Sequence, residues 1–262
     1  MAPMILVRNV DELKGEVISK GVTQRLLLEK AKSASGKLAV STIEIQPWCE
    51  YGPIDYEGEM VYYVLNGYGN LAYAPGGQGE LTNILCDWNS DSYSYIAPKQ
   101  RHSMSDQGQA PLNLLRVEYE ATHSPDSIMP WGVPIFRRNN PVRVDHSPGW
   151  ISTVNQTPQT LRPMGVEHFR AVEYEIVHKA PKPEIPPPKP PEPDAKEEKS
   201  RDEIVNFVVR GKGKYLIGGK QYPVRAGSLI YSSPSGVIDV NPTKLVDVEQ
   251  YTLEFLYFCI RI

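Results

Sequence analysis

The sequence has few cysteines, and no two of them lie close together. Its three cysteines, Cys49, Cys86 and Cys259, are widely spaced, which argues against a disulfide framework, a zinc site built on close pairs and a redox motif. It also lacks any apolar run of membrane-spanning length, and the first apolar run is too short for a signal peptide. We therefore expect a cytoplasmic protein with reduced cysteines and no membrane partner.

An excess of basic residues is missing as well. The chain has 28 Lys and Arg against 31 Asp and Glu, a formal net charge of -3, so no basic field exists to hold a nucleic-acid backbone. Ser-His-Asp triads, nucleotide-binding glycine loops and paired-carboxylate motifs are absent in any recognisable context. Nucleic acid is therefore not expected as a partner, and no sequence motif indicates which reaction the protein would catalyse.

Two similar stretches stand out, Glu59–Tyr73 and Glu203–Ile217. Each is a run of apolar, β-branched and aromatic residues, then Gly-x-Gly, then a second such run. This pattern predicts two antiparallel strands joined by a tight turn. Because the unit recurs about half a chain apart, and 262 residues suffice for two ordinary domains, we expect two similar β-domains.

Further strands are predicted between turn signals. Ile5–Val10 is expected as an edge strand and Leu38–Ile45 as a half-buried strand, with Phe169–Val177 as its equivalent in the second half. Thr23–Glu29 is compatible with a strand or with one helical turn. Short strands with turns every eight to twelve residues or so indicate a sandwich or barrel.

In its order of motifs the chain resembles the cupin superfamily. The order is strand, polar loop, Tyr-Val-Leu-x-Gly-x-Gly, strand, turn, strand, Ala-Pro-x-x-x-His, strand, over residues 5–120. Residues 165–260 look like a degenerate second copy, so the resemblance implies an all-β fold class with two jelly-roll, cupin-like β-barrels in tandem, a bicupin. We expect an N-terminal barrel at 1–122, a connection at 123–164 and a C-terminal barrel at 165–262, interrupted by a mobile proline-rich loop at 180–199.

The family's metal signature is largely missing from the first copy. That signature has two histidines one residue apart, then a glutamate or glutamine, and a third histidine in a later turn. Counting back from Gly67, the first three positions fall on Ile54, Tyr56 and Met60, and the last falls on His102. One good ligand of four remains, so we expect no metal and no other cofactor.

A shifted loop offers a different ligand set. Slipping the chain by one residue brings in Asp55 and Glu59, which with His102 could hold iron, manganese or zinc. The slip would reverse the in-out alternation of the strand that carries Glu59. A divalent metal at these three residues therefore stands as the alternative.

The resemblance also implies a pocket at the open end of the N-terminal barrel. His102 and Tyr56 would face each other there as an acid–base pair that works on a carbonyl without metal. Glu50, Tyr62 and Met104 would line the same cavity, the alternative for each being packing or solvated surface. For His102 the alternative is a barrel histidine hydrogen-bonded to a neighbour.

The second copy keeps no ligand set. Its corresponding residues are Glu198, Ser200, Ile204 and Ile238, so that domain is expected to be structural. Three functions stay open: a small-molecule-binding protein with metal-independent isomerase, lyase or cyclase activity, a non-catalytic scaffold or assembly protein, and a metal-dependent dioxygenase. A small-molecule ligand and a homodimer or higher homo-oligomer are the expected partners.

Overall fold

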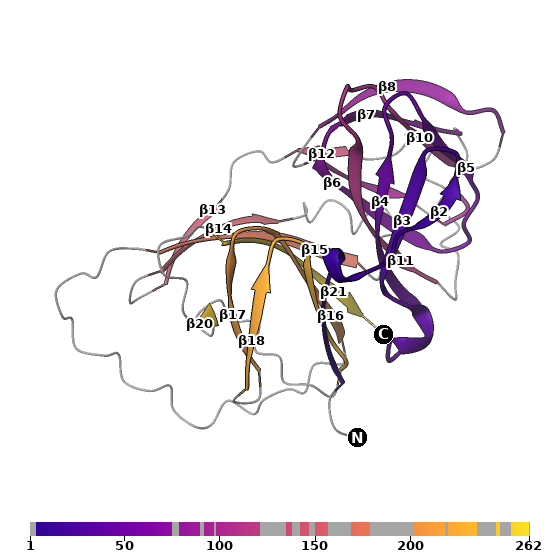
Figure 1. Cartoon of the computed structure of the whole chain (residues 1–262). Coiled ribbons are helices and arrows are strands. Elements are labelled where there is room, and N and C mark those ends of the chain that lie inside the picture. The colour runs from indigo at the N-terminus through magenta and orange to yellow at the C-terminus, as the bar shows by residue number, and fades with distance from the viewer. Residues whose placement is uncertain are drawn as a thin grey trace, which may run out of the picture. The chain divides into compact units, whose positions relative to one another are not determined.

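The computed structural model (Figure 1) describes the backbone of residues 4–74, 79–89, 92–96, 98–120, 135–137, 142–146, 150–156, 169–178, 202–217, 220–234, 245–246 and 253–261. The chain divides into two compact units. The N-terminal unit comprises Val10–Asn139 and Thr157–Glu167, and the C-terminal unit comprises Met1–Asn9, Asn140–Gln156 and His168–Ile262. Within the described residues the regular structure is β-strand apart from two short 3-10 turns, η1 (Val10–Glu12) and η2 (Lys30–Lys32), which confirms the all-β class.

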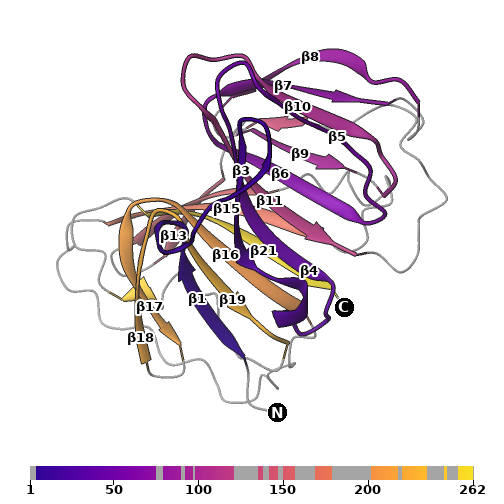
Figure 2. The ribbon, with the colours of Figure 1, turned by 45° about the vertical axis from the view of Figure 1, so that its right-hand side comes forward.

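The N-terminal unit contains two antiparallel sheets, which Figure 2 shows as two layers. Seven strands form the larger sheet in the order β12-β9-β6-β11-β4-β3-β2, with the bounds Ile135–Arg137, Ser92–Ile96, Glu59–Asn66, Leu112–Tyr119, Leu38–Ile45, Val22–Leu28 and Glu16–Ser19. Four strands form the smaller sheet in the order β5-β10-β7-β8, with the bounds Glu50–Ile54, His102–Asp106, Tyr68–Tyr73 and Thr82–Asn89. Since β3 is a strand, the helical alternative for Thr23–Glu29 is wrong.

The repeated stretch is a corner between sheets rather than a paired hairpin. β6 pairs with β9 and β11, whereas β7 pairs with β8 and β10. Gly67 between them has a φ of 98°, and a Cβ there would lie 2.7 Å from the Cα of Leu112. Two strand-like runs around Gly-x-Gly predict a turn but cannot tell whether the strands pair, so the expected pairing is corrected here.

Strand alternation builds the core of the N-terminal unit. Met60, Tyr62 and Val64 lie on one face of β6 and are each at most 2% exposed. They belong to a buried cluster that also draws on both sheets through Leu114 of β11 and Leu71 of β7. The two layers therefore enclose one apolar interior.

The C-terminal unit repeats this pairing. Its larger sheet has the order β1-β19-β16-β21-β15-β14-β13, with the bounds Ile5–Asn9, Ser228–Ser232, Asp202–Arg210, Leu253–Arg261, Phe169–His178, Trp150–Gln156 and Val142–His146. The described part of its second sheet has the order β18-β17-β20, with the bounds Lys220–Arg225, Lys212–Ile217 and Leu245–Val246. β16 lies between β19 and β21 as β6 lies between β9 and β11, and β16 and β17 again belong to different sheets.

The first strand of the chain belongs to the C-terminal unit. β1 was expected as an edge strand and is one, but it pairs antiparallel with β19, from Ile5 opposite Ser232 to Asn9 opposite Ser228. The Asn9 Nδ2 donates to the Ala226 carbonyl and to the Ser228 hydroxyl, both at 3.0 Å. Alternation shows that a segment is a strand and leaves its partner open.

The expected connection at 123–164 also carries strands. β12 pairs with β9 in the N-terminal unit, while β13 and β14 pair with each other in the C-terminal unit. The structure thus divides the chain differently from the boundaries expected from sequence. The proline-rich stretch 180–199, Ile238, Glu198 and Ser200 lie outside the described residues.

Candidate functional site

The inward face of β11 changes from apolar to charged along its length. Leu112 and Leu114 are fully buried in the core cluster of the N-terminal unit. Arg116, also buried, and Glu118, partly buried, follow on the same face because alternate residues of a strand point the same way. Glu120, next in the alternation, is exposed just beyond the strand. We call the group Tyr51, Tyr62, His102, Arg116 and Glu118 the polar end.

His102 lies wholly inside this end and is held through both ring nitrogens. Its Nδ1 lies 2.8 Å from the Gln100 carbonyl and its Nε2 lies 3.1 Å from the Tyr62 hydroxyl. Because a carbonyl only accepts, Nδ1 carries the proton and donates, and Tyr62 therefore donates to Nε2. The two rings meet edge to face, with centroids 5.6 Å apart.

Burial determines the charge state of this pair. The pKa of His102 is lowered from its ordinary 6.5 to about 4, mainly by desolvation and also by the nearby Arg116 cation, while the Gln100 carbonyl opposes the shift. Desolvation likewise raises the pKa of Tyr62 far above its usual range. At neutral pH both groups are uncharged, and His102 is a hydrogen-bond acceptor that orients the Tyr62 hydroxyl.

Arg116 is the permanent charge of the site. Its Nη1 donates to the Tyr51 hydroxyl at 2.8 Å, and its Nε lies 3.2 Å from Glu118 Oε2. In the sheet it stands directly opposite Tyr62. Burial alone would lower the pKa of Arg116, but Tyr62 and Glu118 raise it, so the guanidinium stays protonated.

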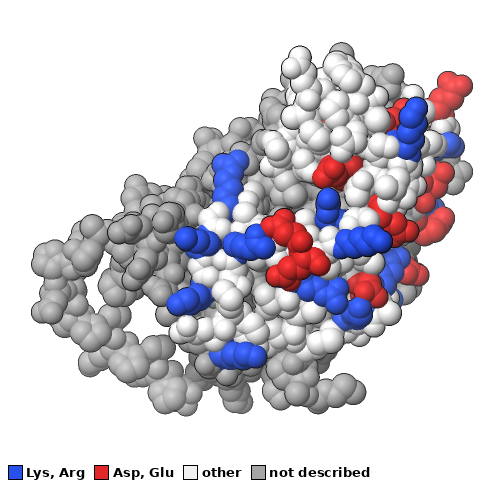
Figure 3. Space-filling view, viewed as in Figure 1, with Lys and Arg blue, Asp and Glu red and all other residues white. Residues whose placement is uncertain are grey.

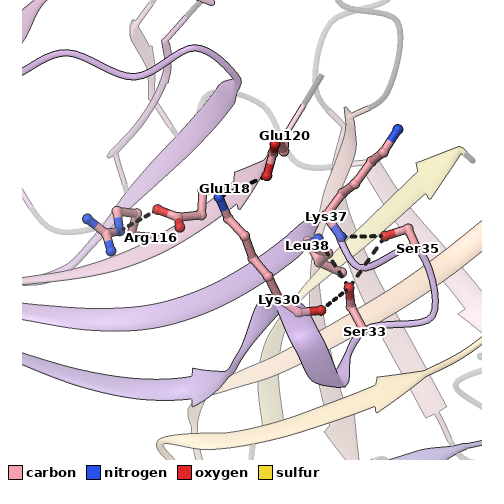
Figure 4. Close-up of polar contacts among 8 residues, drawn as sticks. All are labelled: Lys30, Ser33, Ser35, Lys37, Leu38, Arg116, Glu118 and Glu120. Carbon is pink, nitrogen blue, oxygen red and sulfur yellow. Dashed lines mark hydrogen bonds and ion pairs between the residues drawn. The ribbon is translucent and has the colours of Figure 1, made fainter. Parts of the chain in front are cut away.

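Lys30 on the 3-10 turn η2 lies beside Glu118 and Glu120, as Figure 4 shows. The Lys30 Nζ lies 3.3 Å from Glu120 Oε2, next to the Arg116–Glu118 ion pair. The same Nζ lies 5.1 Å from the centroid of the Tyr56 ring. Burial raises the pKa of Tyr56, and the carboxylate of Glu118 raises it further. Charges of alternating sign thus run from the exposed Glu120 to the buried Arg116.

The structure rearranges the residues predicted from sequence. The hydroxyl that reaches His102 belongs to Tyr62, whereas Tyr56, expected to face it, packs beside the core and under Lys30. Met104 is 0% exposed and part of the core, and Glu50 is exposed on β5. His102, expected in a pocket at the open end of the barrel, is 0% exposed as well.

The alternative metal set does not come together. Asp55 is on the surface, 67% exposed, and 4.0 Å from Arg101 Nε. Glu59 is buried but lies on the face of β6 opposite to Met60. Within the part of the chain that the structure describes, no three His, Cys, Asp or Glu side chains could hold one ion. The in-out alternation that opposed this set at the sequence level is what separates Glu59 from His102.

The positions implied by the cupin resemblance do not fit a metal either. Ile54 has no donor atom, and Met60 offers only a thioether sulfur, which lies 3.3 Å from the Tyr62 hydroxyl. Both nitrogens of His102 are already engaged within the protein. We therefore derive no chemistry from a metal in this unit.

Sequence reasoning missed Arg116 and Tyr51. The signal was present in Leu-Asn-Leu-Leu-Arg-Val-Glu-Tyr, where the inward positions Leu112 and Leu114 continue into Arg116 and Glu118. A charged side chain on the inward face of a strand is rare and is expected to be paired. Counting the alternation through the strand would have placed both charges inside.

Comparisons with known proteins give the fold a name. No family model and no curated protein matches the sequence. The chain is similar in structure to a putative glyoxylate-induced protein from Pseudomonas aeruginosa, with a TM-score of 0.64 and 11% identity over 98% of this chain and 87% of that one. Protein YlbA from E. coli gives a TM-score of 0.62 and 13% identity over 98% and 90%. An oxalate decarboxylase from B. subtilis gives 0.59 and 10% over 97% and 77%.

These structures are cupin-fold proteins. The chain has the cupin fold. At such low identity the likeness establishes the fold alone, since one fold hosts many reactions. At the end of the N-terminal unit where His102 lies, this cupin-fold protein holds a buried cation, Arg116. In the described residues no helix is long and apolar enough to cross a membrane.

Proposed function

We propose that this cupin-fold protein binds a small molecule at the polar end and that Arg116 anchors a carboxylate or a carbonyl oxygen of that molecule. The observation that carries the proposal is a buried guanidinium held between two tyrosines, with Tyr51 bonded at 2.8 Å and Tyr62 directly across the strand pair. A planar fork of donors in a poorly hydrated site is well suited to an oxygen anion.

The surrounding groups would supply chemistry without a metal. Tyr51, whose hydroxyl oxygen accepts from Arg116 Nη1, still has a hydroxyl proton that it can donate to a substrate oxygen. Glu118, 15% exposed at the side chain and ion-paired with Arg116, is a carboxylate that can accept a proton. A proton acceptor beside a cation and a hydroxyl donor suits a metal-independent isomerase, lyase or cyclase acting next to a carbonyl.

A non-catalytic scaffold is the second candidate, and one observation favours it. His102 is 0% exposed and both of its ring nitrogens are bonded within the protein. A polar group that is completely satisfied inside a core serves packing equally well. In that case the polar end would stabilise the unit and bind nothing.

The surface charge does not point to a strongly acidic or strongly basic macromolecule as a partner for either candidate function. On the face in Figure 3, acidic and basic side chains are intermixed, in keeping with a net charge of -3. A cytoplasmic location and a homodimer or higher homo-oligomer remain predictions for both candidates.

The test is a thermal-shift and calorimetric screen of the full chain with acetate, malonate and pyruvate. At least one should raise the melting temperature saturably, because a ligand that binds only the folded state stabilises it. Arg116→Lys keeps the charge opposite Glu118 but loses the fork, so binding should weaken about ten- to a hundredfold, or about 1–3 kcal/mol.

Arg25→Lys is the matched control. Arg25 lies on β3 of the same sheet and pairs with Glu44 at 3.3 Å at the surface, so this change should leave binding untouched. Absence of any saturable rise in the unmodified chain, or equal binding by Arg116→Lys, would favour the scaffold.

A further inference from the structure

Asn206 in the C-terminal unit is a buried amide for which the described residues supply no hydrogen bond. It lies on β16, is 0% exposed, and neither its Nδ2 nor its Oδ1 has a partner among the residues that the structure describes. Buried side-chain amides nearly always have one, because an unpaired amide in an apolar interior is costly. A group that offers both a donor and an acceptor and uses neither toward the described residues needs an explanation.

The internal repeat relates Asn206 to the candidate site of the N-terminal unit. Tyr62 lies between Ser94 of β9 and Arg116 of β11. Asn206 lies between Ile230 of β19 and Tyr257 of β21. Each residue is five positions before the glycine that turns the chain into the next sheet, Gly67 or Gly211. Asn206 therefore occupies in the second copy the place that Tyr62 occupies in the first.

The described side chains beside Asn206 on the same face carry no charge. Alternation puts Ile204 and Val208 beside it on β16, and both are buried. Its neighbour across β19, Ile230, is 0% exposed. The buried Glu203 lies on the opposite face of β16, where it accepts a hydrogen bond from the Tyr231 hydroxyl at 2.6 Å. An anion would have no described cation on this face to pair with.

We infer that the interior of the C-terminal unit binds a small neutral molecule through the Asn206 carboxamide, and that the ligand offers one donor and one acceptor. A primary amide is the simplest complement, because two amides form a cyclic pair of hydrogen bonds. Mostly apolar walls with a few uncharged polar groups are typical of small-molecule sites and exclude charged ligands. The site is separate from the one proposed at Arg116 and does not depend on it.

The experiment uses the full chain with acetamide as the probe and acetate as its charged counterpart. Acetamide should shift the Asn206 side-chain amide signals in an NMR titration until they saturate, and should raise the melting temperature by roughly 2–4 °C near saturation. Acetate should leave the Asn206 side-chain signals unshifted at the same concentrations. The NMR titration needs only the unmodified protein, so it stands even where a variant fails to fold.

Asn206→Leu removes the amide at similar volume and should abolish the rise with acetamide. Asn113→Leu is the control, because Asn113 is a partly buried asparagine whose Nδ2 donates to the Pro111 carbonyl at 3.1 Å in the other unit. The Asn113→Leu variant should still show the rise in melting temperature with acetamide. Unshifted Asn206 signals with acetamide, a rise in melting temperature that survives in Asn206→Leu, or an equal shift of the Asn206 signals with acetate would each overturn the inference.

Discussion

At the residue scale, burial decides what His102 can do. A histidine near solvent titrates close to neutral pH and can exchange protons with a substrate. His102 is fully buried, and its ring accepts from Tyr62 and donates to Gln100. Its role is thus to hold a neighbour in place, and removing it should cost stability as well as any binding, because the Tyr62 hydroxyl would lose its acceptor.

Because His102 is buried with a lowered pKa, the stability of the protein should depend on pH. The pKa of His102 is about 4 in the folded protein against an ordinary 6.5, so between these values the unfolded chain binds a proton that the folded chain does not. The free energy of unfolding therefore has its full value above about pH 6.5 and falls as the pH falls towards 4, by up to about 3 kcal/mol. Urea denaturation at about pH 7.5 and about pH 5 measures the difference.

His102→Gln provides the comparison, because glutamine keeps hydrogen-bonding capacity and does not titrate. Its stability should depend less on pH over the same window, although it is lower overall. Parallel pH profiles for the two proteins would mean that His102 titrates normally and is not enclosed.

At the element scale, the turn at Gly67 joins two sheets rather than two paired strands. Gly67→Ala should destabilise the protein by about 1–3 kcal/mol, since the residue has a φ of 98° and a Cβ would meet backbone atoms of Leu112 and Pro111 within 2.8 Å. Gly36→Ala is the control: Gly36 also has a positive φ, of 70°, but a Cβ there meets nothing within 4 Å. Its cost should be smaller, about 1 kcal/mol. Equal losses in urea denaturation would contradict a role for close packing at the corner.

β1 gives a second prediction at this scale. Deleting residues 1–9 uncovers the edge of β19 and removes the Asn9 hydrogen bonds to Ala226 and Ser228. Hydrogen exchange should speed up in the amides of β19 and its neighbours in the C-terminal unit, and the exposed edge should promote aggregation. Amides of β4 and β11 in the N-terminal unit should keep their protection. Loss of protection in β4 and β11 with β19 unaffected would contradict the assignment of β1.

At the scale of the whole molecule, the two units share a pairing order but differ in what their interiors offer. In the N-terminal unit the position between the two neighbouring strands is Tyr62, which contacts His102 and faces Arg116. In the C-terminal unit it is Asn206, beside the buried Ile204, Val208 and Ile230. The described side chains around Tyr62 thus include charges and those around Asn206 do not, so we expect a different class of ligand in each unit.

A prediction for the whole chain concerns its metal content. Protein purified without chelator should contain less than one equivalent of iron, manganese, nickel or zinc by elemental analysis, because the nitrogens of His102 are engaged and Asp55 is at the surface. Chelator should leave the melting temperature unchanged. If the unmodified protein contained one equivalent of metal and His102→Gln did not, His102 would be a metal ligand and the prediction would be wrong.

The sequence by itself determined the local structure. Alternation marked Leu38–Ile45 and the two repeated stretches as strands, glycine marked the turns, and the residues at the cupin metal positions already lacked donors. These features depend on neighbours along the chain, which the sequence displays directly.

Only the tertiary structure decided which strands pair and which side chains meet. That β1 joins β19, that β6 and β7 lie in different sheets, and that Tyr62 rather than Tyr56 reaches His102 all depend on contacts between distant segments. Strand pairing is held by backbone hydrogen bonds, which carry no residue identity, so composition and alternation cannot specify the partner. The same distant contacts enclose Arg116 and Asn206, and they turn two ordinary strand positions into the two proposed binding sites.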